Sequence, residues 1–164
     1  SAEVKKHTTV LGNRNFAITA GPMSYMAEGT KTWATADGRK AGDPFSIHIG
    51  PTDGRDVNGV NASINSVTKM DHDRQFGITH NLYLVNVDNQ TKIHDMINLI
   101  DYFFNRGGHH LQINCQDKQV LVDAKKNPEK YRGLMIRVAG YVAYFVELPE
   151  QLQEQIINRT SHCV

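Results

Sequence analysis

Hydrophobic and polar positions follow regular patterns mainly in the second half of the chain, from residue 79 to residue 160. β-Branched, aromatic and aliphatic residues fill 79–85, which predicts a strand. Apolar residues then recur at helical spacing, and we expect one buried face made of Ile93, Met96, Ile97, Ile100, Phe103 and Phe104. The two glycines at 107–108 end that helix, and the polar–apolar alternation of 110–115 indicates a half-buried strand.

The pattern continues towards the C-terminal end. Asp117 is placed to cap a further helix, which stops at Pro128 and shares one face among Val120, Leu121 and Ala124. Two short strands are predicted at 134–138 and 143–146, with a turn between them. A last helix runs from about 149 to 160, with Leu152, Ile156 and Ile157 facing inward. This order of strands and helices favours an α/β fold.

The first part of the chain has a different character. Residues 31–61 are dense in Asp-Gly and Asn-Gly turns, which indicates an extended loop lying on another surface. Apolar spacing predicts one short helix over 59–69. We therefore expect a single domain over 1–164, with a turn-rich docking segment at 1–60 and alternating strands and helices at 79–160.

Composition and charge narrow the function classes. Of the 164 residues, 40% are hydrophobic and 21% charged, and the net charge is +1. Lys and Arg are scattered, so neither a nucleic-acid interface nor a membrane surface is indicated. No apolar run reaches the roughly 18 residues of a membrane span, and the first residues lack the apolar core of a signal peptide. With only two cysteines, a cytoplasmic protein is expected.

Most residues with reactive side chains give no specific signal. The eight histidines lack the spacing of metal ligands, so no metal site is expected, although a metalloenzyme that uses several of them stays an alternative. Cys115 shares the apolar side of its predicted strand, which favours a buried structural thiol. Cys163 lies in the tail, where a thiol is usually incidental. No glycine-rich phosphate loop is present, so no bound cofactor is expected.

Gly140 is the exception. Alone it is a turn glycine between two short strands, but it stands in the run Ile-Arg-Val-Ala-Gly-Tyr at 136–141. Upstream lie Gly-Gly-His-His-Leu-Gln-Ile-Asn at 107–114 and Ala-Asp-Gly-Arg-Lys-Ala-Gly at 36–42. These blocks, in this order across about residues 11–160, resemble the C-terminal end of glycyl radical enzymes. That family includes pyruvate formate-lyase, diol dehydratases, choline trimethylamine-lyase and arylacetate decarboxylases.

The resemblance implies both a fold and a role. The fold would be the C-terminal portion of a ten-stranded α/β barrel, with the glycine on a strand-tip loop. Gly140 would store a backbone radical installed by an activase that uses S-adenosylmethionine and an iron–sulfur cluster. Arg137, Val138, Ala139 and Tyr141 match the motif around the glycine and would act structurally. The radical would pass to a cysteine of the barrel portion, which starts an anaerobic, oxygen-sensitive lyase reaction.

Glycine suits this role for a physical reason. A radical at a backbone Cα is stabilised by conjugation with the two flanking amide groups, which requires a near-planar carbon. A side chain would clash with those groups and oppose planarity. A loop at a strand tip also leaves the scaffold in place when it opens.

Neither Cys115 nor Cys163 matches the catalytic cysteine of that family, so the chain is expected to be inactive without a barrel portion. It would be the C-terminal part of a lyase, a subunit of a split enzyme, or a spare-part subunit that docks onto a glycyl radical enzyme. Residues 142–148 look more like the dehydratase, amine-lyase and decarboxylase branch than like pyruvate formate-lyase, although Val142 departs from a frequent serine.

Overall fold

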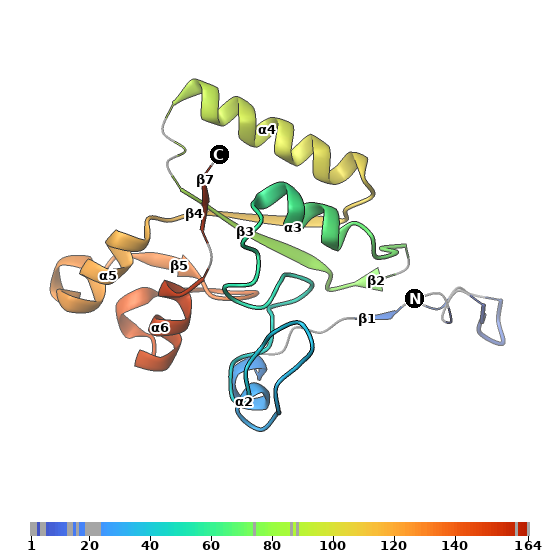
Figure 1. Cartoon of the computed structure of the whole chain (residues 1–164), viewed down its shortest axis with the longest axis horizontal. Coiled ribbons are helices and arrows are strands. Elements are labelled where there is room, and N and C mark those ends of the chain that lie inside the picture. Colours follow the sequence, from blue (N-terminus) through green and yellow to red (C-terminus); the bar gives the residue numbers. More distant parts are fainter. Residues whose placement is uncertain are drawn as a thin grey trace.

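The computed structural model describes residues 3, 6–12, 15, 17–18, 24–73, 75–85, 87, 89–159 and 161–163. Helices and strands mix along the chain, and α4 lies along β3 and β4 while α5, α6 and β5 group to one side (Figure 1). The elements are β1 (Ala17–Ile18), α2 (Tyr25–Thr30), α3 (Val60–Val67), β2 (Gln75–Phe76), β3 (Thr79–Val85), α4 (Gln90–Asn105), β4 (His110–Cys115), α5 (Lys118–Lys126), the 3-10 turn η1 (Pro128–Tyr131), β5 (Met135–Arg137), β6 (Val142–Tyr144), the 3-10 turn η2 (Phe145–Glu147), α6 (Glu150–Ile157) and β7 (His162–Cys163).

The central sheet has the order β4-β3-β7, and both of its strand pairs are parallel. β3 pairs with β4 from Thr79 opposite His110 to Leu84 opposite Cys115. Parallel strands need a crossover connection, and α4 provides it between β3 and β4. The strands predicted at 79–85 and 110–115 and the helix between them are therefore confirmed.

The first apolar core fills the face of β3 that α3 and α4 cover. Its buried members are Ile64, Val67, Leu82, Leu84, Leu99 and Phe103. His80 lies on the same face with no exposed surface, and its Nε2 is 3.3 Å from the Ser63 hydroxyl. The ring of His80 also stacks on Phe103 at a centroid distance of 6.1 Å.

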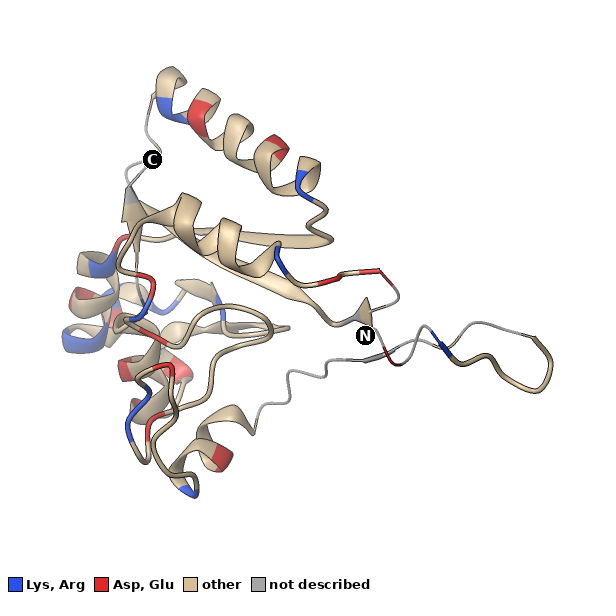
Figure 2. Ribbon diagram, turned by 45° about the vertical axis from the view of Figure 1, so that its right-hand side comes forward, with Lys and Arg blue, Asp and Glu red and all other residues tan. Residues whose placement is uncertain are grey.

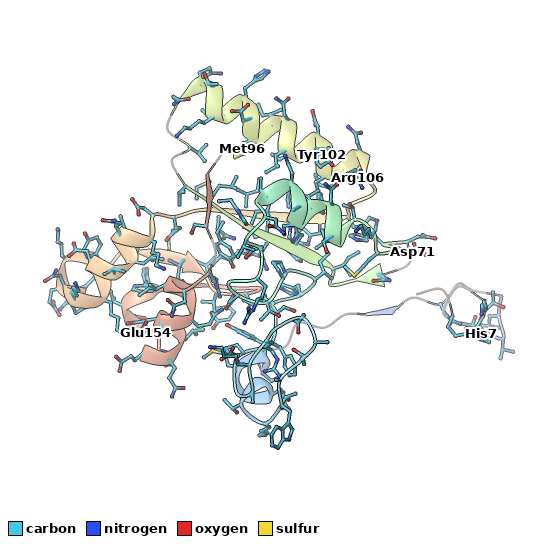
Figure 3. The ribbon with its side chains drawn as sticks, viewed as in Figure 1. His7, Asp71, Met96, Tyr102, Arg106 and Glu154 are labelled. Atoms are coloured by element: carbon cyan, nitrogen blue, oxygen red, sulfur yellow. The ribbon has the colours of Figure 1, made fainter. Side chains whose placement is uncertain are left out.

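Polar contacts join α3 and α4 beside this core. The Tyr102 hydroxyl donates to Asn65 Oδ1 at 2.6 Å, and Arg106 Nε donates to Thr68 Oγ1 at 3.1 Å. Along α4, Lys92 is followed by Asp95 and Asp101, and Arg106 comes just after the helix, whereas β3 and β4 carry no charged residue (Figure 2). Figure 3 labels Tyr102 and Arg106 near the C-terminal end of α4.

The buried face of α4 differs from the predicted one. Leu99 and Phe103 are buried, whereas Ile93, Ile97 and Phe104 are 37%, 46% and 48% exposed. The apolar arc of this helix is wider than the surface formed by β3, β4 and α3, so only one side of the arc is covered. Spacing along the helix identified the arc but not the part of it that is buried.

Cys115 is also placed differently from the prediction, because its free thiol belongs to an exposed residue. It is the last residue of β4, an edge strand of the three-stranded sheet. The apolar neighbours on its strand, Leu111 and Ile113, are themselves only partly buried. The predicted alternation of 110–115 is therefore weak in the folded chain.

The second core forms between the β5–β6 hairpin and the helices α5 and α6. Its buried members are Leu121, Ala124, Ile136, Val138, Phe145, Ile156 and Ile157. Asp117 caps α5 by accepting from the Gln119 amide at 2.8 Å, as predicted. Val120 is 38% exposed, so it does not share the buried face expected for it. The strand predicted at 143–146 corresponds to β6, which ends at Tyr144. The chain turns there, so that Phe145 enters the core.

The turn-rich segment at 31–59 contains neither helix nor strand. It folds around Arg39, which is 1% exposed and donates to the Asp43 carbonyl at 2.6 Å and to the Trp33 carbonyl. The Arg39 guanidinium also lies 4.6 Å from the centroid of the Phe45 ring. In the described ranges, no helix combines the length and apolarity that a bilayer crossing requires.

His80 should make stability depend on pH. Burial lowers its pKa from the ordinary 6.5 to about 4, so between these values the unfolded chain binds a proton that the folded chain excludes. Stability should fall on the order of 3 kcal/mol as the pH drops from about 6.5 to about 4. Urea unfolding across this window should show the slope in wild type and in His109→Asn, an exposed control, and lose it in His80→Asn. An equal slope in His80→Asn would assign the effect to other groups.

Candidate functional site

Gly140 lies at the exposed tip of the β5–β6 hairpin. The Val138 amide donates to the Tyr141 carbonyl at 2.9 Å and closes the turn around it. A Cβ added at Gly140 would meet no atom within 4 Å beyond its immediate chain neighbours, and its φ lies outside the left-handed region. Packing and backbone conformation therefore do not require glycine here.

The residues before Gly140 are held firmly. Val138 is 3% exposed and belongs to the second core, while Ala139 is 6% exposed and packs with Tyr25 and Ile47. The hairpin thus rests on the turn-rich N-terminal part of the chain as well as on α6. Of the motif residues at 137–141, the three before the glycine are partly or fully buried, whereas Gly140 and Tyr141 are exposed.

Arg159, just after α6, binds the same limb of the hairpin. Its guanidinium donates to the Val138 carbonyl at 2.7 Å and to the Arg137 carbonyl at 3.3 Å. It is 5% exposed, and it lies 5.2 Å from the centroid of the Tyr83 ring on β3. Planar guanidinium donors suit this simultaneous binding of several acceptors.

Gln155 extends the network towards the N-terminal part. Its Oε1 accepts from Arg159 at 3.0 Å and from the Tyr25 hydroxyl at 3.2 Å, and its Nε2 donates to Asp53 Oδ2 at 2.6 Å. Two donors on one side and a carboxylate on the other fix the orientation of the amide. Burial raises the pKa of Tyr25, so its hydroxyl stays protonated and remains a donor at neutral pH.

The chain that follows the hairpin is held by α6. Gln153 Nε2 donates to the carbonyls of Phe145 at 3.0 Å and Leu148 at 3.1 Å, just beyond β6. On the outward side of α6, Glu154 (Figure 3) pairs with Lys125 of α5. The C-terminal helix therefore fixes the chain after β6 and is itself tied to α5, while Arg159 just beyond the helix binds the limb before Gly140.

The sequence reasoning named Gly140 and its neighbours but gave no role to Arg159, Gln155 or Tyr25. Gln155 and Arg159 are four residues apart, with the inward-facing Ile156 between them in sequence, so the helix predicted over 149–160 would place them on one face, although α6 ends at Ile157. A polar pair beside an apolar face was the available signal. Among the described residues, no three His, Cys, Asp or Glu side chains gather as metal ligands would.

Comparison with known proteins agrees with this geometry. The model of the family described as "Glycine radical" matches residues 45–146, which include Gly140. Trans-4-hydroxy-L-proline dehydratase of Clostridioides difficile is 38% identical over 160 residues, covering 96% of this chain and 20% of that protein.

Solved structures give the same result. The structure of hydroxyproline dehydratase from Clostridioides difficile with trans-4-hydroxy-L-proline bound matches at a TM-score of 0.85 and 36% identity, over 99% of this chain and 21% of that one. The glycerol-bound B12-independent glycerol dehydratase from Clostridium butyricum matches at a TM-score of 0.83 and 36% identity, again over 99% and 21%. The α/β fold expected from the resemblance is confirmed, and this chain spans about a fifth of the length of these relatives.

Alanine substitutions at two glycines should separate steric need from chemical need. Gly140→Ala should change the free energy of unfolding by less than about 0.5 kcal/mol, because nothing crowds the tip. Gly108→Ala should cost about 1–3 kcal/mol, because its Cβ would lie 2.4 Å from the ring of the fully buried Phe103. Denaturant unfolding of both variants measures this, and a large loss in Gly140→Ala would mean that the fold itself requires the glycine.

Proposed function

Since the chain belongs to the glycine radical family, that of the glycyl radical enzymes, we propose that Gly140 stores the backbone radical of an anaerobic radical lyase. The observation that carries the proposal is a glycine at an exposed hairpin tip, anchored through the Val138 carbonyl, where neither packing nor φ requires glycine. What requires glycine is then the radical. Its Cα loses a hydrogen atom and becomes planar, in conjugation with the two adjoining peptide groups.

Each step moves one hydrogen atom. An activase that uses S-adenosylmethionine and an iron–sulfur cluster removes a hydrogen atom from the Gly140 Cα. The radical then takes the S–H hydrogen of a cysteine, which restores glycine and leaves a thiyl radical to attack the substrate. That cysteine belongs to a barrel portion beyond the residues of this chain, because Cys115 lies at the end of β4 in a different sheet from the hairpin.

The reaction class follows the relatives. Cleavage of a C–O, C–N or C–C bond is proposed, with the dehydratase and decarboxylase branch favoured. The names of the matched proteins, two of them dehydratases of small hydroxylated molecules, support this branch. The setting is cytoplasmic and anaerobic, and the partners are the barrel portion and the activase.

A second candidate is a spare-part or structural subunit that docks onto a glycyl radical enzyme without catalysing a reaction itself. The observation in its favour is the turn-rich segment at 31–59, which folds around Arg39 without helix or strand. Capture of a lyase cleaved at its own glycine from an anaerobic lysate supports this candidate. Capture of no lyase removes it.

Anaerobic activation tests the main proposal directly. With a matched activase and the barrel portion, the wild-type chain should give a glycyl doublet in electron paramagnetic resonance. Gly140→Ala should give none, because its Cα cannot reach the planar conjugated state. A Gly133→Ala control, at another uncrowded glycine, should keep the signal. An unchanged doublet in Gly140→Ala would place the radical elsewhere.

Exposure of the activated protein to air provides a second test. Oxygen should break the backbone at the radical carbon, and because 164 − 140 = 24, the released piece should hold about 24 residues, with α6 and β7 in it. Mass spectrometry under denaturing conditions should find this piece. An intact chain after a confirmed doublet would contradict the radical at Gly140.

A further inference from the structure

Arg159 contacts four residues in three different parts of the chain at once. It donates to the carbonyls of Arg137 and Val138 on the hairpin and to Gln155 on α6, and it lies over the Tyr83 ring on β3. Only 5% of Arg159 is exposed, so little solvent is available to replace a partner that moves away.

The two carbonyls that Arg159 binds are those immediately before the radical motif's tip. The Val138 carbonyl belongs to the peptide group that leads into Ala139, and the next peptide group adjoins Gly140. Ala139 is buried against Tyr25 and Ile47, while Gly140 is exposed and a Cβ added there would meet no atom within 4 Å beyond its chain neighbours. The last anchored backbone group before the free tip is therefore held by Arg159.

Gln155 fixes the orientation of the guanidinium. Its Oε1 accepts from Arg159, and the same amide is locked by the Tyr25 hydroxyl and the Asp53 carboxylate. Asp53 also places a negative charge near the buried cation, although the residue as a whole remains partly exposed.

We propose that Arg159 is a positioning residue that anchors the limb of the hairpin before Gly140 and sets how readily the tip moves for hydrogen abstraction. The inference rests on the proposed radical at Gly140. Activation requires that the activase reach the tip, whereas storage requires that the tip stay against the proposed barrel portion. Weaker anchoring should therefore raise the rate of radical formation and shorten the lifetime of the stored radical.

Two opposite changes distinguish this role from a general structural one. A variant that merely destabilises the fold lowers both the rate of radical formation and the lifetime of the radical. A variant that only frees the hairpin raises the rate and lowers the lifetime. Arg159→Lys keeps the charge, but one ammonium group cannot span both carbonyls and Gln155. Gln155→Met leaves the carbonyls their donor and removes the orienting amide.

The experiment uses the native protein that contains this sequence, with Arg132→Gln and Gln151→Met as exposed controls. In Arg159→Lys, amide hydrogen exchange over residues 134–148 should quicken about fivefold, the loss expected for one hydrogen bond. The doublet should form several-fold faster with the activase and decay several-fold faster in anaerobic buffer. Gln155→Met should likewise raise the rates of hydrogen exchange, doublet formation and doublet decay, and the two control variants should match wild type.

If Arg159→Lys does not fold, as judged by its circular dichroism melting curve, Gln155→Met decides alone. The positioning role is overturned if the folded variants show the same rates of hydrogen exchange, radical formation and radical decay as wild type. It is also overturned if both the rate of radical formation and the lifetime of the radical fall. Absence of a doublet in wild type would instead overturn the radical at Gly140, which the hydrogen-exchange result does not address.

Discussion

A buried guanidinium joins parts of the molecule that apolar packing leaves separate. The core around Phe103 and the core around Phe145 share no buried residue, and a smaller cluster forms around Tyr25. Arg159 bonds the hairpin beside one core, lies on Tyr83 of the strand that carries the other, and reaches Tyr25 through Gln155. A buried cation is costly unless its donors are paired. Both terminal nitrogens of Arg159 are hydrogen-bonded, whereas its Nε has no partner among the described residues, so this network tolerates few alternative arrangements. The position of the glycine hairpin depends on that restriction.

The surfaces that stay apolar fit a chain that spans about a fifth of its relatives. Ile97 and Phe104 on α4 and Val142 beside the glycine hairpin are 46%, 48% and 54% exposed. Exposed apolar residues of this size mark surfaces that contact other protein. Val142 lies on the glycine hairpin itself, whereas Ile97 and Phe104 lie on the part of the α4 apolar arc that β3, β4 and α3 leave uncovered.

Local signals in the sequence were enough to predict the main strands and helices from residue 59 onward, and both ends of α5. Asp117 and Pro128 bound α5 because capping and the missing proline amide act over a few residues. The buried side of α4 and the exposure of Cys115 were not predictable in this way, since both depend on how far neighbouring elements reach. The Arg159 network was harder still, because the bond between Tyr25 and Gln155 joins residues 130 apart in sequence. Periodicity identifies which residues share a face, but not what that face meets.

The radical proposed at Gly140 has two requirements that usually oppose each other. A radical store must be rigid enough to hold a planar carbon in one place, yet it must leave that place to be activated. The hairpin separates these requirements in space: donors from Arg159 restrain the limb before the tip and Gln153 restrains the chain after β6, while a Cβ added at Gly140 would meet no atom within 4 Å beyond its chain neighbours. An alanine would fit the folded chain at this tip, so the demand for glycine arises only when a hydrogen atom leaves the Cα. Motion of the tip is then governed by the strength of a few identified hydrogen bonds, and the chemistry at the tip by the lack of a side chain.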